Sequence, residues 1–142
     1  MSPLLILLQF LAIYQSVFAD KAHDIAIELD KAINEPESLE VFRNVIAVPI
    51  LMEDCDKVIR SYGAKDVEKT IENQYDNFHT DHGKAAVKDR SLSDAKFEGE
   101  DEKVISFTVA YHNGETFIFK ARELEGGKFV IFKVVDCQKH IQ

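Results

Sequence analysis

The sequence predicts an α+β fold in which helices come first and an antiparallel sheet follows. Apolar residues recur at helical spacing through the first half of the chain. From Leu92 onward, apolar and polar residues alternate in short runs separated by turns that contain glycine, which is typical of strands. The 142 residues, 46% hydrophobic and 30% charged, fit one folded domain and exclude a disordered chain.

Residues 1–19 have the pattern of a secretory signal. The run LLILLQFLAI at residues 4–13 is apolar but too short to span a bilayer, which takes ~20 residues. Val17 and Ala19 provide the small or aliphatic side chains that precede a cleavage site, and charged residues begin immediately afterwards, at Asp20. A buried amphipathic first helix is the alternative. We therefore expect cleavage after Ala19 and a secreted, extracellular protein without a membrane anchor.

Two helices are predicted in the part of the chain that follows. The first covers His23–Ile33. The second begins at Asn34-Glu35-Pro36-Glu37, where a capping residue precedes a proline in the first turn, and continues to about Ala47. Residues 41–51 are rich in β-branched side chains, so a strand is the alternative there, and Pro49 ends or kinks whatever precedes it. The side chains expected to point inward are Ile25, Leu29, Ala32, Ile33, Leu39, Phe42, Val45 and Ile46.

Two further helices are predicted before the sheet. The first starts at Ile50 and stops at Gly63, and the apolar residues at helical spacing in it are Leu51, Cys55, Val58, Ile59 and Tyr62. The second covers residues 66–75 and presents on one face Val67, Ile71 and Tyr75. Residues 76–83 are polar and are expected to hold at most a short strand, while residues 84–90 add one or two helical turns.

Four antiparallel strands are predicted to follow as a meander. Asn113-Gly114 is the favoured two-residue hairpin turn, and Gly126-Gly127 turns the chain again. The run FVIFKVV in the last strand indicates cover on both faces of the sheet. The strands are expected at Leu92–Phe97, Lys103–His112, Thr116–Arg122 and Lys128–Asp136.

The two cysteines, Cys55 and Cys137, are expected to form a disulfide. In an oxidising compartment two buried thiols are more often bonded than free. A bridge across so long a loop would stabilise the fold by roughly 4 to 5 kcal/mol in the chain-entropy model. The wide spacing and the absence of a Cys-x-x-Cys pair argue against zinc binding or redox catalysis. No Asn-x-Ser/Thr motif is present, so N-glycosylation is not predicted.

Two stretches of the sequence resemble a known superfamily. The run CDKVIRSYGAKDVEK at Cys55–Lys69, followed by Tyr75-Asp76-Asn77-Phe78, resembles the opening of the nuclear transport factor 2-like superfamily. The ending KFVIFKVVDC at residues 128–137 is similar to the last strand of a secreted nematode branch, in which a terminal cysteine faces one in the first helix. The resemblance implies a cystatin-like α+β cone, in which a curved antiparallel sheet wraps around N-terminal helices. It also implies a family domain at residues 50–142 and an added helical segment at residues 20–49.

The densest set of metal-ligand side chains is the run His79-Thr80-Asp81-His82. In an extended strand His79 and Asp81 share one face while His82 points away, so we expect a solvated loop without a metal or cofactor. In the superfamily that the sequence resembles, ketosteroid isomerases place an aspartate base near Asp81 and a tyrosine donor on the first helix. An enolate would lack that donor on this helix, because the comparable inward positions hold Cys55, Val58 and Ile59. Tyr62 and Tyr75 are the alternative donors, although a tyrosine at such a position is more often a core residue with its hydroxyl at the rim.

The strand-rich half contains six phenylalanines, which either fill the core or line an apolar ligand cavity. We expect a non-catalytic binding module whose partner is an unknown protein or a small apolar ligand; the alternative is a small enzyme of ketosteroid-isomerase type. Two or more buried, mutually bonded polar groups in the cone would favour catalysis. The acidic balance, 25 Asp and Glu against 17 Lys and Arg, argues against nucleic-acid binding. The residues expected to line the cone are Tyr62, Tyr75, Phe107, Phe117 and Phe119.

One apolar row on the last strand is expected to need its own cover. If Phe129, Ile131 and Val135 face the helices, strand alternation turns their neighbours to the opposite side of the sheet. That outer row is too apolar for water, and it comprises Val130, Phe132 and Val134, joined by Ile118. Its cover would be either a second copy of the protein, in a homodimer through the sheet, or the helices of residues 20–47 folding back.

Overall fold

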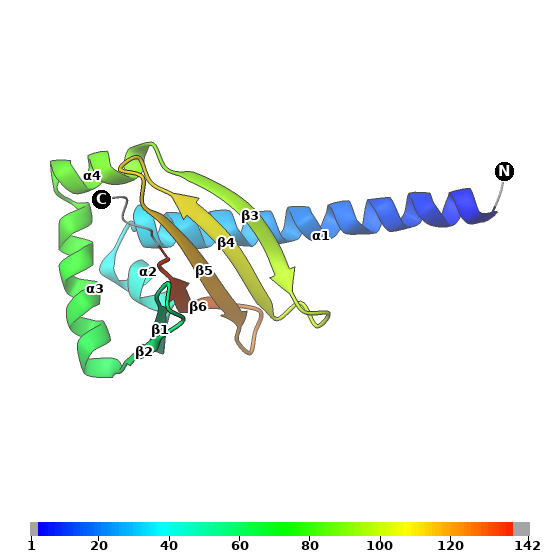
Figure 1. Cartoon of the computed structure of the whole chain (residues 1–142). Helices are drawn as coiled ribbons and strands as arrows, with labels where there is room; N and C mark the ends of the chain where they lie inside the picture. The colour runs from blue at the N-terminus through cyan, green and yellow to red at the C-terminus, as the bar shows by residue number, and fades with distance from the viewer. Residues whose placement is uncertain (1–2, 138–142) are drawn as a thin grey trace.

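The computed structural model describes residues 3–137 and has the α+β architecture that the sequence predicts. Helices lie against one face of a curved six-stranded sheet (Figure 1). The strand order is β2-β1-β6-β5-β4-β3; β1 and β6 are parallel and the other neighbours are antiparallel. The elements are α1 (Pro3–Asn34), α2 (Leu39–Asn44), β1 (Ile46–Glu53), β2 (Ile59–Tyr62), α3 (Ala64–Phe78), α4 (Asp81–Lys88), β3 (Ser91–Glu98), β4 (Val104–Ala110), β5 (Thr116–Glu123) and β6 (Phe129–Val135).

Helix α1 packs its C-terminal half against the inner face of the sheet, and its N-terminal half extends beyond the strands (Figure 1). The buried stripe of this helix includes Ala22 and Ala26, whose small side chains let the helix backbone approach β3 and β4 closely. Leu29 and Ile33 are buried as predicted, whereas Ile25 and Ala32 lie at the edge of the contact. None of the described helices combines the length and the hydrophobicity needed to cross a membrane.

The predicted helix between Ile50 and Gly63 is wrong. This part of the chain forms the antiparallel β1–β2 hairpin instead, and the strand alternative for residues 41–51 is confirmed from Ile46 onward. The Asp54 carboxylate builds the turn by accepting hydrogen bonds from the backbone N–H groups of Asp56 and Val58, each at 3.0 Å. The apolar spacing in this segment suits a helix as well as two strands, and pairing of β1 with the distant β6 decides for strands.

The remaining helices differ from the prediction mainly at their ends. Helix α2 begins after Ser38, whose hydroxyl accepts a hydrogen bond from the Val41 N–H at 3.2 Å, and ends at Asn44 rather than at Ala47. Helix α3 contains the predicted helix of residues 66–75 and buries Val67 and Ile71. The polar stretch at residues 76–83 is the junction of α3 and α4 instead of a strand. Thr80 caps α4 there through a 3.0 Å bond from the Gly83 N–H.

Strands β3 to β6 form the meander that the sequence predicts, and their inner face carries the core. Phe107, Ile105 and Val109 of β4 are fully buried against helix α1 and its neighbours. The chain turns at Asn113-Gly114, but the predicted two-residue turn is wrong: the loop has three residues, His112–Gly114, and is closed by hydrogen bonds from the Tyr111 N–H to the Glu115 carbonyl at 2.8 Å and from the Gly114 N–H to the Tyr111 carbonyl at 3.0 Å. Gly114 is at φ 89°, and the Asn113 side chain accepts the Glu115 N–H at 2.9 Å. Alternation in a half-covered sheet therefore predicts β4 and β5 well, whereas β6 is predicted by its continuous apolar run, and the described helices cover only one of its faces.

A bulge in β6 corrects the predicted faces of that strand. The register with β5 shifts between the Ile131 and Lys133 positions, so Phe132 is an extra residue that reverses the alternation. Val134 consequently packs inward opposite Phe119, and Val135 lies on the outer face opposite Ile118. The alternative in which residues 20–47 cover the outer face is also wrong, because their apolar side chains belong to the inner core; these are Ile25, Leu29, Phe42 and Ile46.

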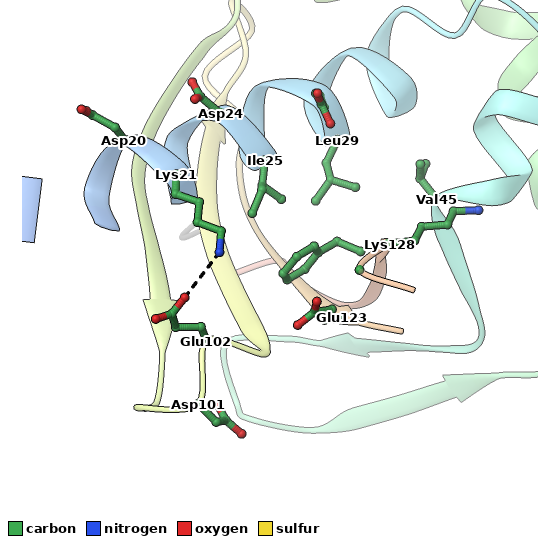
Figure 2. A pocket seen from close by; sticks show the side chains of 13 residues that line it. Asp20, Lys21, Asp24, Ile25, Leu29, Val45, Asp101, Glu102, Glu123 and Lys128 are labelled. Atoms are coloured by element: carbon green, nitrogen blue, oxygen red, sulfur yellow. Dashed lines mark hydrogen bonds and ion pairs between the residues drawn. The ribbon is translucent and has the colours of Figure 1, made fainter. Parts of the chain in front are cut away.

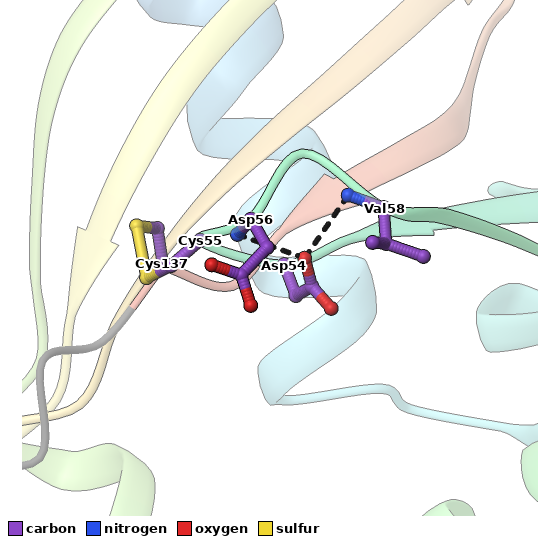
Figure 3. Close-up of a disulfide and its surroundings, with 5 residues drawn as sticks. All are labelled: Asp54, Cys55, Asp56, Val58 and Cys137. Atoms are coloured by element: carbon purple, nitrogen blue, oxygen red, sulfur yellow. Dashed lines mark hydrogen bonds between the residues drawn. A yellow bond between two sulfur atoms is a disulfide. The ribbon is translucent and has the colours of Figure 1, made fainter.

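The predicted disulfide between Cys55 and Cys137 is present (Figure 3). Its two Cα atoms are 4.3 Å apart, and the cysteines are separated by 82 positions in the chain. The bond joins the β1–β2 turn to the segment that follows β6, rather than a helix to the last strand. A backbone hydrogen bond from Asp136 to Glu53, 2.8 Å long, aligns the two segments beside the disulfide.

Candidate functional site

A cavity of about 270 Å³ lies between the inner face of the sheet and the helices at the C-terminal end of α1. Four phenylalanine rings supply much of its wall: Phe42 of α2, Phe78 of α3, and Phe117 and Phe119 of β5. Phe42 and Phe78 meet edge to face with ring centres 5.7 Å apart, and Phe117 is 6.3 Å from Phe119. The aliphatic part of the wall comes from α1, β1 and β6, with Ile33, Ile46, Ile50, Ile131 and Val134.

Two bonded polar side chains enter this apolar wall. The Tyr111 hydroxyl, directly after β4, donates a hydrogen bond of 2.7 Å to Oδ1 of Asn34, the last residue of α1. Asn34 is 4% exposed, and its Nδ2 donates to Asp30 Oδ1 at 2.8 Å. Burial raises the pKa of Tyr111 to about 12, against the opposing effect of the bond to Asn34. Tyr111 is therefore a protonated hydroxyl at neutral pH.

Behind this pair, Arg90 neutralises the buried Asp30 carboxylate. Arg90 Nη2 is 2.9 Å from Asp30 Oδ2 and 2.6 Å from Glu35 Oε2, and Nη1 donates to the Val87 carbonyl at 2.8 Å. Burial alone would lower the pKa of Arg90, but its bonds to Asp30 and Glu35 outweigh burial and raise that pKa above its ordinary value. The result is a continuous chain of bonds from Arg90 through Asp30 and Asn34 to Tyr111 at the cavity.

Among residues 3–137, the cavity lining offers no group suited to abstract a proton from a ligand. The described residues that line it include no aspartate, glutamate or histidine, and the polar ones are Asn34, Gln74 and Tyr111. The nearest carboxylate in the bond network, Asp30, already accepts hydrogen bonds from both Asn34 and Arg90. These described residues can therefore hold and orient a ligand, and none of them is a free base.

The structure brings together some of the residues expected to line the cone. Phe117 and Phe119 line the cavity, and Tyr62 lines a neighbouring cavity of about 340 Å³ that shares the wall formed by Phe42, Ile46 and Ile50. Phe107 lies fully buried against Phe119, with ring centres 5.4 Å apart. Tyr75 packs on the ring of His79 at 4.3 Å and is not part of either lining.

The run from His79 to His82 does not converge on a site. His79, Asp81 and His82 are exposed where α3 meets α4, and His79 Nδ1 is 2.8 Å from the Tyr75 carbonyl. Asp81 lies in the first turn of α4 and is absent from the cavity lining. Within residues 3–137, no group of three or more histidine, cysteine or acidic side chains is placed to hold a metal ion.

Sequence reasoning missed the polar pair at the cavity. One signal for it is present in α1, where residues at intervals of four fall on one helix face. Along that face the buried Ala22 and Ala26 are followed by Asp30 and Asn34, so two polar side chains continue an otherwise buried stripe. A polar pair in such a position indicates buried hydrogen-bond partners, although it does not identify them.

No family model matches the chain, and no curated protein matches its sequence. Solved structures with the same fold include an NTF2-like protein from Cytophaga hutchinsonii, with a TM-score of 0.55 at 14% identity over 84% of this chain and 97% of that one. A designed protein with a curved β-sheet gives a TM-score of 0.55 at 15% identity, over 82% and 96% of the two chains.

A third structure of this fold is a candidate ketosteroid isomerase from Parabacteroides distasonis, with a TM-score of 0.53 at 8% identity over 82% and 86% of the two chains. At such identities these similarities establish the fold and nothing more. The class of architecture is therefore the cone of nuclear transport factor 2-like proteins, and function has to be argued from this chain's own residues.

Proposed function

We propose that the protein is a secreted, non-catalytic binding module whose cone holds a small, largely apolar ligand with one polar group. The observation that carries the proposal is the cavity of about 270 Å³ with four phenylalanine rings around the bonded Tyr111–Asn34 pair. Apolar walls with a few convergent polar groups are the usual form of a small-molecule site. The modest volume favours a ligand of one or two rings or a short branched chain.

The polar pair also indicates which ligand group it would receive. Because the Tyr111 hydroxyl donates its proton to Asn34, its oxygen has lone pairs left to accept a hydrogen bond. Gln74, elsewhere in the lining, can donate as well as accept. A ligand hydroxyl or N–H directed at Tyr111, with the rest of the molecule against the phenylalanine rings, would satisfy both parts of the wall.

Catalysis of ketosteroid-isomerase type is the second candidate, favoured by the buried and mutually bonded Tyr111, Asn34 and Asp30. Such an enzyme needs a carboxylate base as well as a donor for the enolate oxygen. Asp30 is held by Arg90, and Asp81 lies outside the cavity lining. We therefore prefer the binding module. Turnover of a β,γ-unsaturated ketone that is lost in Asp30→Asn would reverse that preference.

Secretion is part of the proposal, and two features support it. Residues 1–19 have the pattern of a signal, and the chain carries a disulfide between Cys55 and Cys137. Expression of the full chain in a secreting eukaryotic cell tests it. The medium should contain a protein whose sequence begins at Asp20, and retention inside the cell would contradict the idea.

The outer face of the sheet supports a homodimer as a further part of this proposal. The described helices all lie on the other face (Figure 1), and apolar side chains lie side by side on this one; they are Leu51, Ile118, Val130, Phe132 and Val135. Multi-angle light scattering should give the mass of two chains for the protein and of one chain for Ile118→Lys. A wild-type monomer that stays soluble at high concentration would overturn the dimer.

Native mass spectrometry and a probe ligand test the binding function directly. The secreted protein should retain extra mass that is lost on unfolding, and the emptied protein should bind 2-naphthol, a two-ring alcohol. Val134→Phe, which fills the cavity, should abolish binding, and Tyr111→Phe should weaken it several-fold by removing one hydrogen bond. Tyr75→Phe is the matched control outside the lining and should bind normally. Equal binding by all variants would reject the proposed site.

A further inference from the structure

A second concavity, of about 1030 Å³, shares no lining residue with the aromatic cavity. It is an open groove between the middle of α1 and the turns that join β3 to β4 and β5 to β6 (Figure 2). Its floor is apolar, with Ile25 and Leu29 pointing into it from α1 and Phe129 and Val45 completing it. Ile25, Val45 and Phe129 keep part of their surface exposed, so the floor is accessible from solvent.

Carboxylates stand on both rims of this apolar floor. Along α1 the rim carries Asp20, Asp24 and Glu28. The opposite rim carries Asp101 and Glu102 of the β3–β4 turn and Glu123 at the end of β5 (Figure 2). Against these six acids the lining has two lysines, Lys21 and Lys128, which leaves a formal charge of −4, half of the −8 of the whole chain. The groove is therefore the place where an acidic protein concentrates its charge around an apolar surface.

Among residues 3–137, one ion pair crosses the groove, and it contributes little stability. Lys21 Nζ lies 3.5 Å from Glu102 Oε2, with the two side chains 60% and 34% exposed. Exposed ion pairs of this kind contribute little stability, so a stronger cationic partner can replace Lys21. Asp20, Asp24 and Glu28 form no ion pair with any other described residue. Most of the rim charge is therefore free to meet an external cation.

We propose that this groove binds a basic amphipathic helix of a partner protein. An apolar floor between two acidic rims is complementary to an apolar stripe flanked on both sides by lysine or arginine. The acids of the α1 rim are spaced by four residues, or about 6 Å along the helix, which is also the spacing of lysines at i, i+4 and i+8 on a facing helix. A small organic cation would need neither the second rim nor the length of the floor.

A synthetic helix tests the proposal. The probe is a 15-residue peptide of leucine and lysine with a continuous leucine stripe between two lysine rows, and its binding is followed by fluorescence anisotropy. We expect saturable binding by the secreted protein that weakens with added salt. A scrambled peptide of the same composition, without the stripe, should bind about tenfold more weakly, because it keeps the charge and loses the apolar match.

Matched variants locate the site. Asp24→Asn, Glu28→Gln and Glu123→Gln together keep the shapes of three rim side chains and should weaken binding about tenfold. Glu72→Gln, Asp76→Asn and Glu115→Gln remove the same charge from exposed positions outside the groove and should leave binding unchanged. All six positions are exposed, so circular dichroism should show an unchanged fold.

Three results would overturn the proposal. The first is equal binding of the ordered and scrambled peptides, which would mean charge attraction alone. The second is an equal loss of affinity in the rim and control variants. The third is full competition by spermidine at equal molar affinity, which would assign the groove to a small cation. Because the groove and the aromatic cavity share no lining residue, 2-naphthol binding should remain intact in the rim variant, so the two proposals can fail separately.

Discussion

The two ends of the packed part of α1 carry the same acidic side chains in opposite circumstances. Asp30 is 8% exposed, ion-paired to Arg90 and hydrogen-bonded to Asn34. Asp20 and Asp24, about three and two turns earlier, are exposed and have no ion-pair partner among residues 3–137. An acid that the fold neutralises helps to shape a cavity, whereas an acid left without a cation is available to a partner. Burial and pairing, rather than residue type, decide between the two roles.

The largest expected effect on stability comes from removing the disulfide between Cys55 and Cys137. Changing Cys55 and Cys137 to serine together should lower the free energy of unfolding by about 4 kcal/mol, because the unfolded chain regains the freedom of an 82-position loop. Urea unfolding monitored by circular dichroism measures it. Binding of 2-naphthol should weaken because Ile50 of β1 lines the cavity, while the groove peptide should still bind under native conditions. A loss below about 1 kcal/mol would contradict this account.

Removal of the cation that pairs with Asp30 should have the next largest effect. Arg90→Ala leaves a buried carboxylate without its partner and should cost about 3 kcal/mol of unfolding free energy. The matched control is Arg43→Ala, which breaks the 2.8 Å pair with Glu68 at the surface, where both side chains are more than a third exposed. That pair should contribute less than about 1 kcal/mol. Equal losses in the two variants would remove the distinction between buried and exposed acids.

Loss of one hydroxyl tests the polar pair in the cavity wall. Tyr111→Phe leaves Asn34 Oδ1 without its donor in a buried position and should cost about 1 to 3 kcal/mol. Thermal or urea unfolding beside Tyr75→Phe, whose hydroxyl has no such role, measures the difference. An unchanged stability for Tyr111→Phe would mean that water or another group replaces the hydroxyl without cost.

Alkaline pH should lower the free energy of unfolding, because the same Tyr111 hydroxyl ionises. The pKa of Tyr111 is raised in the folded state to about 12, above its ordinary value of 10.0. Between these values the folded protein holds a proton that the unfolded chain releases, so the free energy of unfolding falls as pH rises from about 10 to about 12. Unfolding measured against pH should show this loss in the wild type and not in Tyr111→Phe. Parallel pH profiles would contradict the raised pKa.

The smallest effect on the free energy of unfolding is expected for the acids on the α1 rim of the groove. Asp24→Asn and Glu28→Gln should change the free energy of unfolding by less than about 0.5 kcal/mol each, because these exposed carboxylates have no ion-pair partner in the described chain. Asp30→Asn is the contrasting variant on the same helix and should be clearly destabilised. A large loss in Asp24→Asn would show that the rim acids support the fold, which would weaken the case for a partner.

The same contrast explains what could be predicted from sequence. Strands β4 and β5 and helix α3 are visible because one half of each element is covered, so apolar periodicity reports burial directly. The cysteine pair could be expected because the chain has only two cysteines. The aromatic wall was anticipated through Phe117 and Phe119, since both lie on the inward face of a predicted strand.

The remaining features depend on partners far away in the chain. The β1–β2 hairpin is decided by pairing with β6, about 80 positions later, and local spacing favours a helix just as well. The Phe132 bulge reverses the last strand without any glycine or proline to signal it. Tyr111 and Asn34 are 77 positions apart, so neither residue alone indicates the bond between them. Each of these features depends on a contact between distant parts of the chain, and for that reason the sequence did not predict it.

The position of β6 has a consequence for the order in which the protein is made. This strand is the last of the six in the chain, yet it lies in the interior of the sheet, between β1 and β5. Until residues 129–137 have left the ribosome, the β1–β2 hairpin and the β3–β5 meander have no strand to join them, and Cys55 has no partner. Both parts would present open strand edges during synthesis, when aggregation is most easily started. Completion of the sheet, closure of the cavity and formation of the disulfide all wait for the same nine residues.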